Sequence, residues 1–242
     1  MSLFSPIVTE FWRTQFANAA LFHGDTTFTI AVNPELEEGS RVMVLKTTDG
    51  RGAAVLTPTM ADRLGLAAGH DLTEATFRRK LAEAGVILNG ADFVFYFSDG
   101  ARQALTQEKP EAGVGQLTDQ DGAIFSAFQS SASEQDLDDA YVELDHWAVF
   151  GSFDDGRLVC AASMYPWEDA PIADTGVLTL PSYRGKGHAR KVVRAISRYA
   201  CEQGYEPQYR CQTDNLASVA LAKTAGLTLF GTWEVISPDS PD

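Results

Sequence analysis

Residues 179–189, with the sequence TLPSYRGKGHA, place a glycine-rich turn between an apolar segment and a long amphipathic one. An apolar run that ends at Pro181 is typical of a buried strand, because proline has no N–H to donate to a sheet. Downstream, small and apolar residues recur at helical spacing from residue 189 to residue 200, with Gly204 as the expected end. The junction therefore predicts a strand, a tight loop and a helix in direct succession.

This loop has the features of an anion-binding site. The first turn of a helix leaves backbone N–H groups without partners, and the helix dipole adds partial positive charge there. Gly185 and Gly187 lack the Cβ atoms that would keep a phosphate away from those donors, and Arg184 and Lys186 add full positive charge. We expect the loop to hold a phosphorylated ligand.

Three phosphate-loop patterns are candidates for this sequence. A dinucleotide fingerprint needs G-x-G-x-x-G, but Arg190 stands at the third glycine position. A Walker A loop needs Lys after its second Gly, where this sequence has His188. The pattern [RQ]-x-x-G-x-[GA] is met in full by Arg184, Gly187 and Ala189. A surface turn that carries two glycines and two cations is the plainer alternative.

Two spaced motifs resemble the GNAT superfamily of acyl-CoA-dependent N-acyltransferases. The first is GVLTLPSYRGKGHA at residues 176–189, and the second is NLASVALAKTAGL at residues 215–227. The resemblance covers about residues 113–236. It implies an α+β fold, in which helices flank a mixed central sheet.

The resemblance also implies where acetyl-CoA, the co-substrate, would bind. Thr179 and Leu180 would offer backbone groups to the pantetheine arm, while Asn215 and Ser218 would line the other side of the cofactor. In the loop, the backbone N–H of His188 would matter more than its imidazole. The pyrophosphate would lie on a loop made of Arg184, Gly185, Lys186, Gly187, His188 and Ala189.

The activity implied by the resemblance is N-acetyl transfer from acyl-CoA to a primary amine of a small molecule or a protein. No Ser-His-Asp or Cys-His arrangement is evident, so we expect direct transfer in a ternary complex. Asp174, at the start of the motif strand, is the general base that we choose, and a solvated strand-entry aspartate is the alternative reading. The other candidates for the base are Glu143, His146, Glu168 and Asp169.

One departure from the family concerns the general acid. Many members carry a Tyr seven residues after the motif Asn, where it protonates the leaving thiolate, but this sequence has Ala222 there. Because a thiol has a pKa of about 8.5, the thiolate is a tolerable leaving group without that Tyr. The alternative function is a non-catalytic acyl-CoA-binding regulatory module that kept the cofactor site and lost the chemistry.

Composition restricts the partners. The formal net charge of −14 argues against nucleic-acid binding and favours cationic acceptors such as free amines. The three cysteines have no ligand spacing, so neither a metal site nor a disulfide framework is expected. No apolar run reaches membrane-spanning length, and the N-terminus has no signal pattern. We therefore expect a cytoplasmic protein with no membrane partner.

With 242 residues, the chain can bury two modest cores. We predict an N-terminal α+β domain over residues 1–110 and a GNAT-like domain over residues 113–236, with a polar linker at about residues 98–115. The first resembles what a degenerate copy of the same fold would look like. Its role stays open between a wall of the substrate pocket, a homodimer surface and plain scaffold.

Local patterns predict the elements of both domains. In the first we expect strands at residues 27–32, 42–46, 53–56 and 92–97 and helices at 59–67 and 73–84. In the second, Asp154, Asp155 and Gly156 predict a hairpin turn. The second domain should then read β-α-α-β-β-β-α-β-α-β, with helices at 122–130, 135–144 and 216–225 besides the motif helix.

Overall fold

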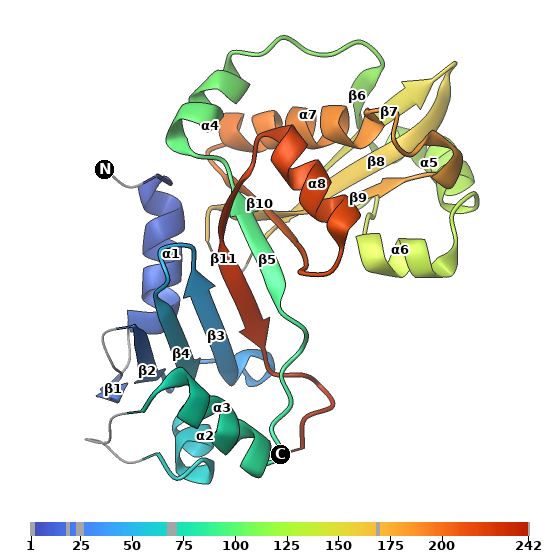
Figure 1. Ribbon diagram of the computed structural model, residues 1–242. Helices are drawn as coiled ribbons and strands as arrows, with labels where there is room; N and C mark the ends of the chain where they lie inside the picture. Colours follow the sequence, from blue (N-terminus) through green and yellow to red (C-terminus); the bar gives the residue numbers. More distant parts are fainter. Residues whose placement is uncertain (1–2, 18–19, 23–26, 67–71, 168–169, 242) are drawn as a thin grey trace. The chain divides into compact units, whose positions relative to one another are not determined.

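The structure of the chain is a computed structural model, which describes residues 3–17, 20–22, 27–66, 72–167 and 170–241. Helices and strands alternate in it around mixed sheet, which confirms the expected α+β class (Figure 1). The elements are, in chain order, α1 (Pro6–Ala17), β1 (Ala20–Phe22), β2 (Phe28–Val32), β3 (Val42–Thr47), β4 (Gly52–Leu56), α2 (Pro58–Arg63), α3 (Glu74–Glu83), β5 (Asp92–Tyr96), α4 (Asp99–Thr106), β6 (Val114–Leu117), α5 (Gly122–Gln129), α6 (Glu134–Ala140), β7 (Ala148–Asp154), β8 (Arg157–Pro166), β9 (Ile172–Thr179), α7 (His188–Glu202), β10 (Glu206–Gln212), α8 (Leu216–Ala225) and β11 (Thr228–Val235).

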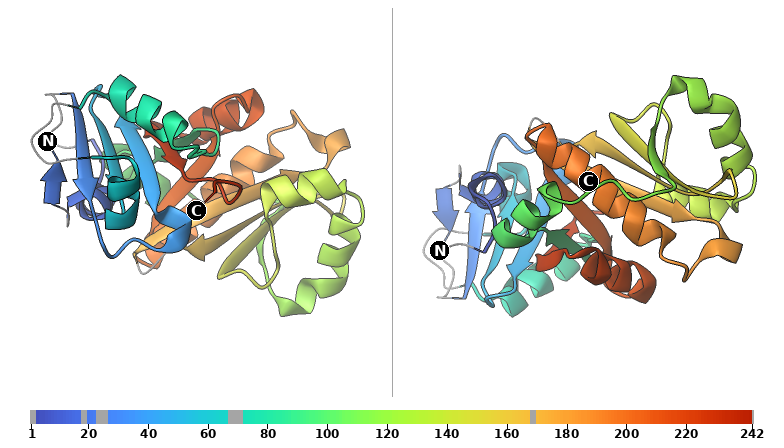
Figure 2. Two further views of the ribbon diagram at one scale, coloured as in Figure 1. Left: turned by 90° about the horizontal axis from the view of Figure 1, so that it is seen from below. Right: turned by 90° about the horizontal axis from the view of Figure 1, so that it is seen from above.

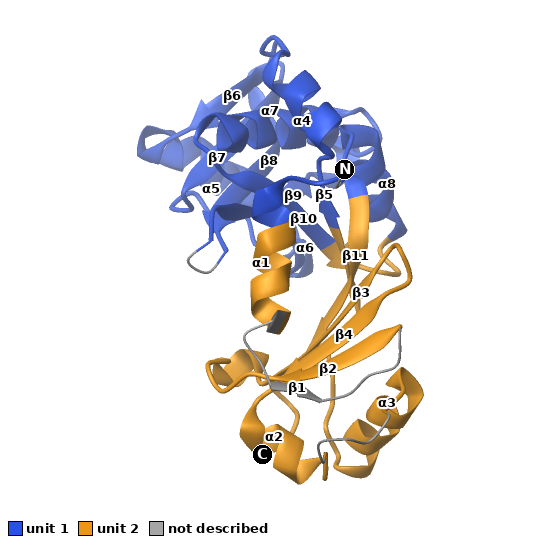
Figure 3. Cartoon of the chain, turned by 90° about the vertical axis from the view of Figure 1, so that its left-hand side faces the viewer, with its two compact units in different colours: residues 1–8, 95–210, 216–228 blue, residues 9–94, 211–215, 229–242 orange. Residues whose placement is uncertain are grey.

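The chain divides into two compact units, which Figure 3 colours separately. Unit 1 comprises residues 1–8, 95–210 and 216–228, and unit 2 comprises residues 9–94, 211–215 and 229–242. These bounds differ from the division at residues 1–110 and 113–236, which stays a prediction. The last strand of the predicted second domain, β11, belongs almost wholly to unit 2, where it pairs with β3 in antiparallel fashion.

Unit 1 is built on neighbouring strands in the order β10-β9-β8-β7-β6. The pairs from β6 to β9 are antiparallel, and β9 and β10 are parallel. Alternate residues of the strands serve two cores: Val149, Ala161 and Leu178 pack against α5 and α6, whereas Ala148, Ala162 and others pack against α7. In Figure 2, α7 and the α5–α6 pair lie on opposite sides of these strands.

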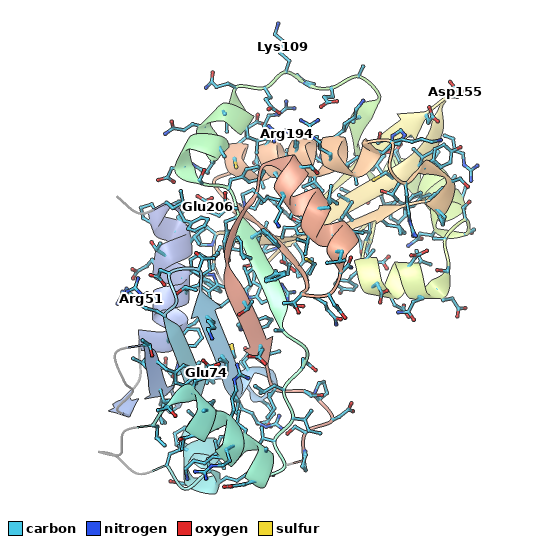
Figure 4. The ribbon with its side chains drawn as sticks, viewed as in Figure 1. Arg51, Glu74, Lys109, Asp155, Arg194 and Glu206 are labelled. Carbon is cyan, nitrogen blue, oxygen red and sulfur yellow. The ribbon has the colours of Figure 1, made fainter. Side chains whose placement is uncertain are left out.

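The element order predicted for the second half of the chain is confirmed, from β6 through α5, α6, β7, β8, β9, α7, β10 and α8 to β11. The predicted hairpin turn joins β7 to β8, and its tip is marked by Asp155 in Figure 4. Asp155 and Gly156 adopt φ angles of 47° and 78°, the left-handed pair that a tight hairpin turn needs. Short-range turn chemistry thus fixed this hairpin.

Two predictions about helices in this half are wrong. The segment expected to be a polar linker contains α4, because the Ser98 hydroxyl caps its N-terminus by accepting from the Ala101 N–H at 3.3 Å and Leu105 is buried. The helix expected at residues 135–144 ends as α6 at Ala140, because Tyr141 takes a left-handed φ of 45°. Helix α1 was not predicted at all.

Unit 2 has its strands in the order β1-β2-β4-β3-β11. Strands β2 and β4 are parallel, and β3 is antiparallel to both β4 and β11. Helices α2 and α3 close a core that includes Phe28, Val44, Leu56 and Phe77, and Trp12 of α1 stacks on Phe230 with ring centroids 5.9 Å apart. The strands and helices expected between residues 27 and 97 are present, although α2 is shorter than predicted and residue 67 lies outside the described residues.

Glu206, labelled in Figure 4, is a buried carboxyl at the start of β10 and is 1% exposed. Its Oε1 lies 3.3 Å from the Arg102 Nε. Burial raises the pKa of Glu206, against the smaller opposing effects of Ser5 and Arg102. Ionising this group therefore costs more free energy in the folded protein than in the unfolded chain. The free energy of unfolding should fall as pH rises from about 4.3 towards the raised pKa.

We predict that Glu206→Gln removes this pH dependence. Urea unfolding of the parent and the variant at pH 4.5 and pH 7 measures it, with Glu202→Gln as the control, because Glu202 is 52% exposed on the same unit. The parent should lose more stability between the two pH values than Glu206→Gln does. Equal losses in both proteins would show that the burial of Glu206 has no such effect.

Candidate functional site

The pairing between strands β9 and β10 stops halfway along β9. Their parallel pairing runs from Ile172 with Glu206 to Thr175 with Tyr209, while β9 continues to Thr179. On the other side β9 stays paired to β8 as far as Thr179 with Cys160. Among the described residues, none of β10 pairs with residues 176–179, so that stretch of β9 has an open edge.

The register identifies which backbone groups line that edge. The Leu180 N–H donates to the Val159 carbonyl at 3.0 Å, and antiparallel bonding alternates along the strand. Residues 176 and 178 therefore bond to β8, whereas Val177 and Thr179 direct their N–H and C=O groups towards the gap. The Thr179 carbonyl also accepts from Arg184 Nε at 3.1 Å. Val177, which the sequence did not single out, thus joins the Thr179 N–H at the open edge.

Leu180, unlike Thr179, has both of its backbone groups hydrogen-bonded within the protein. Its N–H is bonded to Val159, and its carbonyl accepts from the Tyr183 N–H at 2.9 Å. A ligand that used either group would have to compete with these bonds. Its role as a cofactor contact stays a prediction.

The loop after β9 leads directly into α7. Gly185 and Gly187 have φ angles of 76° and 86°, which residues with a Cβ rarely adopt, and Gly187 is the N-cap of α7. In the part of the chain that is described, none of the backbone N–H groups of residues 185–190 donates to a backbone carbonyl. A Cβ placed on Gly187 would meet no atom within 4 Å. The loop therefore presents a row of free donors to open space.

Two side chains of the loop bond to other elements, and a third lies over a neighbouring ring. Arg184 Nη2 donates to Asp136 Oδ1 of α6 at 2.7 Å, which ties the loop to that helix. Lys186 Nζ lies 4.7 Å from the centre of the Tyr183 ring. His188 Nδ1 is 2.9 Å from Ser152 Oγ of β7, and this contact anchors the first turn of α7. Ala189 packs partly buried in the core beneath α7.

The second motif forms α8 and the turn before it. Asn215 is exposed, and its N–H donates to the Gln212 carbonyl at 3.0 Å. Asn215 belongs to unit 2 and Ser218 to unit 1, so their common placement beside the loop stays a prediction. Ala222 is fully buried on α8 and brings no polar group to the site.

Asp174 lies one residue before the point where β9 and β10 part. It is 5% exposed, and its carboxylate accepts from three side chains. Arg210 Nη2 donates to Oδ2 at 2.9 Å, Gln208 Nε2 to Oδ1 at 3.0 Å, and the Tyr165 hydroxyl to Oδ2 at 3.2 Å. The guanidinium of Arg210 in turn lies 4.0 Å from the centre of the Trp167 ring. Asp174 is thus a carboxyl group held in a fixed orientation at the inner end of the open edge.

An aromatic cluster covers this carboxylate. The rings of Tyr141, His146 and Tyr165 contact one another, with centroids 4.9 to 5.7 Å apart. His146 Nδ1 is 2.8 Å from Ser163 Oγ of β8. Burial lowers the pKa of His146, against the opposing charges of Asp145 and Glu143, which favours the neutral imidazole.

The structure says less about the other three candidates for the general base. Glu143 is exposed and lies 3.4 Å from Gln129 Nε2. Glu168 and Asp169 lie outside the described residues. Within the residues that are described, no helix is long and apolar enough to cross a membrane, and no cluster of three acidic, His or Cys side chains could hold a metal ion.

The segment that contains this site matches the model of a known protein family. The family model described as "Acetyltransferase (GNAT) family" matches residues 122–227. No curated protein sequence matches the chain. The matched residues contain both the loop and the parted strands.

Solved structures are similar to the chain at low identity. A GNAT-family acetyltransferase from Colwellia psychrerythraea shares 16% identity at a TM-score of 0.50, over 76% of this chain and 75% of that one. GCN5-related N-acetyltransferases match from Sphaerobacter thermophilus (13% identity, TM-score 0.47, 84% of this chain and 81% of that one) and Kribbella flavida (18%, 0.46, 69% and 65%). The Colwellia match supports the same fold.

Proposed function

Residues 122–227 belong to the GNAT family of acetyltransferases, which makes the chain an acyltransferase, and on that premise we propose that it transfers an acetyl group from acetyl-CoA to a primary amine of a small molecule or a protein. The observation that carries the proposal is continuity. Only Leu180, a single 3-10 turn at Pro181–Tyr183 and Arg184 separate the open edge of β9 from the loop of free N–H donors at the start of α7.

We assign the two parts of acetyl-CoA to these two features. The pyrophosphate is held by the backbone N–H groups of residues 185–190, where the dipole of α7 favours negative charge. The pantetheine arm runs antiparallel to residues 177–179 and bonds their backbone groups as an additional strand would. Four residues of strand span about 13 Å, so the thioester is carried to the neighbourhood of Asp174.

Transfer is direct in this proposal, without an acyl-enzyme. A covalent route through cysteine needs a thiolate, yet burial raises the pKa of Cys160 to about 12 and those of Cys201 and Cys211 to about 11. These thiols stay protonated and inaccessible. The acceptor amine therefore attacks the thioester itself, and a backbone N–H of the open edge stabilises the oxygen on which charge develops.

The acceptor enters, in this proposal, at the end of the edge where Asp174 lies. Asp174 takes the proton that the attacking amine loses, directly or through water. The net charge of −14 favours the approach of a cationic amine. A cytoplasmic location and a homodimer stay predictions.

We predict that Asp174→Asn lowers turnover at least tenfold, about 1.4 kcal/mol of barrier, without changing the affinity for acetyl-CoA. The amide keeps the size of the carboxylate and still accepts from Arg210, but it cannot take up a proton. Steady-state kinetics and calorimetry with acetyl-CoA measure the two quantities, and Asp119→Asn, an exposed site before α5, serves as the control. Undiminished turnover would move the base to His146 or to water.

The proposed activity is tested by release of CoA thiol across a panel of amines. The panel should contain monoamines, diamines, polyamines, amino acids and peptides with free lysine side chains. At least one acceptor should give thiol release that depends on both substrates. Binding of acetyl-CoA with no release for any amine would point to a non-catalytic acyl-CoA-binding module.

A further inference from the structure

The Tyr165 hydroxyl lies over the boundary between β9 and β10, although the residue belongs to β8. Tyr165 is the cross-strand neighbour of Asp174, and its hydroxyl donates to Asp174 Oδ2 on β9. The same carboxylate is bonded from the far side by Gln208 and Arg210 of β10. The phenol is therefore placed where the two strands part, at the inner end of the open edge.

A proton donor in this region would speed transfer to an amine. When the carbon–sulfur bond breaks, the departing thiolate takes up a proton, and a positioned acid typically speeds such a step 10²- to 10⁴-fold, as an order of magnitude. Position 222 cannot supply the proton, because it is a buried alanine. His146 is poorly suited, because burial favours its neutral form and its Nδ1 is engaged with Ser163.

Building on the proposed function, we propose that Tyr165 is the catalytic acid that protonates the departing CoA thiolate, and that Asp174 returns the proton to it. The cationic amine gives one proton to solvent as it enters and attacks in its neutral form. As its nitrogen bonds to the acyl carbon, its proton passes to the Asp174 carboxylate. The carbon–sulfur bond breaks, and the phenol proton of Tyr165 passes to sulfur.

The site then resets across the Tyr165–Asp174 hydrogen bond. The proton held by Asp174 moves over the 3.2 Å to the phenolate, which leaves amide, free thiol and both residues in their starting states. Arg210 and Gln208 hold the carboxylate in place for this transfer through their hydrogen bonds to Oδ2 and Oδ1. In this proposal Asp174 is the general base, Tyr165 is the general acid, and the hydrogen bond between them returns the proton.

The surroundings of Tyr165 keep its phenol protonated before the reaction, and they also make it a weaker acid. Burial, and then the charge of Asp174, raises the pKa of Tyr165 to about 12. The phenol is accordingly protonated throughout the physiological range. Tyr141 of the same cluster is 56% exposed and has no hydrogen bond to Asp174 among the described contacts, so it is not linked to the proposed base.

The test is Tyr165→Phe, which removes the hydroxyl and keeps the ring. Turnover with the best amine should fall at least 100-fold, while the calorimetric Kd for acetyl-CoA changes less than twofold. Tyr205→Phe is the matched control, because it removes a phenol that lies on the α7 side of the sheet beside Trp147. A second variant carries 3-fluorotyrosine at position 165, which preserves shape and hydroxyl but makes the phenol more acidic.

The outcomes separate this inference from the proposed function. A large loss in Tyr165→Phe together with a changed rate and unchanged Kd in the fluorinated protein supports it. Turnover that survives in Tyr165→Phe, or that is lost instead in Tyr141→Phe, overturns it while acetyl transfer stands. If Tyr165→Phe unfolds, the fluorinated protein decides, and an unaltered rate there overturns the inference. A parent inactive on every amine overturns both.

Discussion

Gly187→Glu should weaken acetyl-CoA binding at least 100-fold, about 2.7 kcal/mol, while the protein stays folded. Two effects add. The carboxylate would occupy the open space in front of the free N–H groups at the start of α7, and its charge would repel the pyrophosphate. The φ angle of 86° also strains any residue with a Cβ, which costs about 1 kcal/mol of stability.

The other end of the same helix offers a matched control. Gly204 has a φ angle of 87° and, like Gly187, would direct a Cβ into space with no atom within 4 Å. Gly204→Glu therefore introduces the same strain and the same charge away from the loop. Calorimetry with acetyl-CoA should show wild-type affinity for Gly204→Glu and severe loss for Gly187→Glu. Equal affinities in the two variants would rule out the loop as the pyrophosphate site.

Gly176→Ala should lower the free energy of unfolding by about 3 kcal/mol. Helix α6 ends against β9 at this point, and a Cβ on Gly176 would lie 2.2 Å from the Ala140 carbonyl oxygen and 3.0 Å from that of Tyr141. Backbone atoms cannot rotate away as a side chain can, so the end of α6 must move. Because Tyr141 belongs to the aromatic cluster over Asp174, the displacement should also disturb the proposed acceptor end.

Urea unfolding measures the effect, and Gly122→Ala is its control. Gly122 has a helical φ of −53° at the start of α5, and a Cβ there would meet nothing within 4 Å. Alanine favours the helix over glycine, so that variant should be neutral or slightly more stable. A Gly176→Ala protein as stable as the parent would show that α6 does not press on β9 at this residue.

Local chemistry explains which parts of the fold were predictable. The strand, loop and helix around residues 179–189 follow from Pro181, two glycines and a helical apolar stripe, all of which act over a few residues. The β7–β8 turn follows likewise from Asp155 and Gly156. Helix α4 was missed because it is mostly polar, and its only clear signal is the cap made by Ser98. The pairing of β11 with β3 joins residues far apart in sequence, and no local pattern specifies it.

The same distinction applies to the site. Asp174 was singled out from its position on the motif strand, but its partners Tyr165, Gln208 and Arg210 come from two other strands, and their register sets the contacts. A sequence without the register cannot reveal them. Nor could it indicate that the backbone groups of Leu180 are already bonded. The cofactor contacts assigned to Asn215 and Ser218 stay predictions.

The central claim is that this chain moves an acetyl group from acetyl-CoA to an amine, and labelled acetyl-CoA tests it most directly. The protein is incubated with acetyl-CoA labelled in its acetyl group and with the amine panel, and the label is followed by mass spectrometry together with the free thiol. We predict that the label appears on an amine as an amide, with one thiol released for each amide formed. Thiol release with the label left as free acetate, or bound acetyl-CoA with no labelled amine, would contradict the claim.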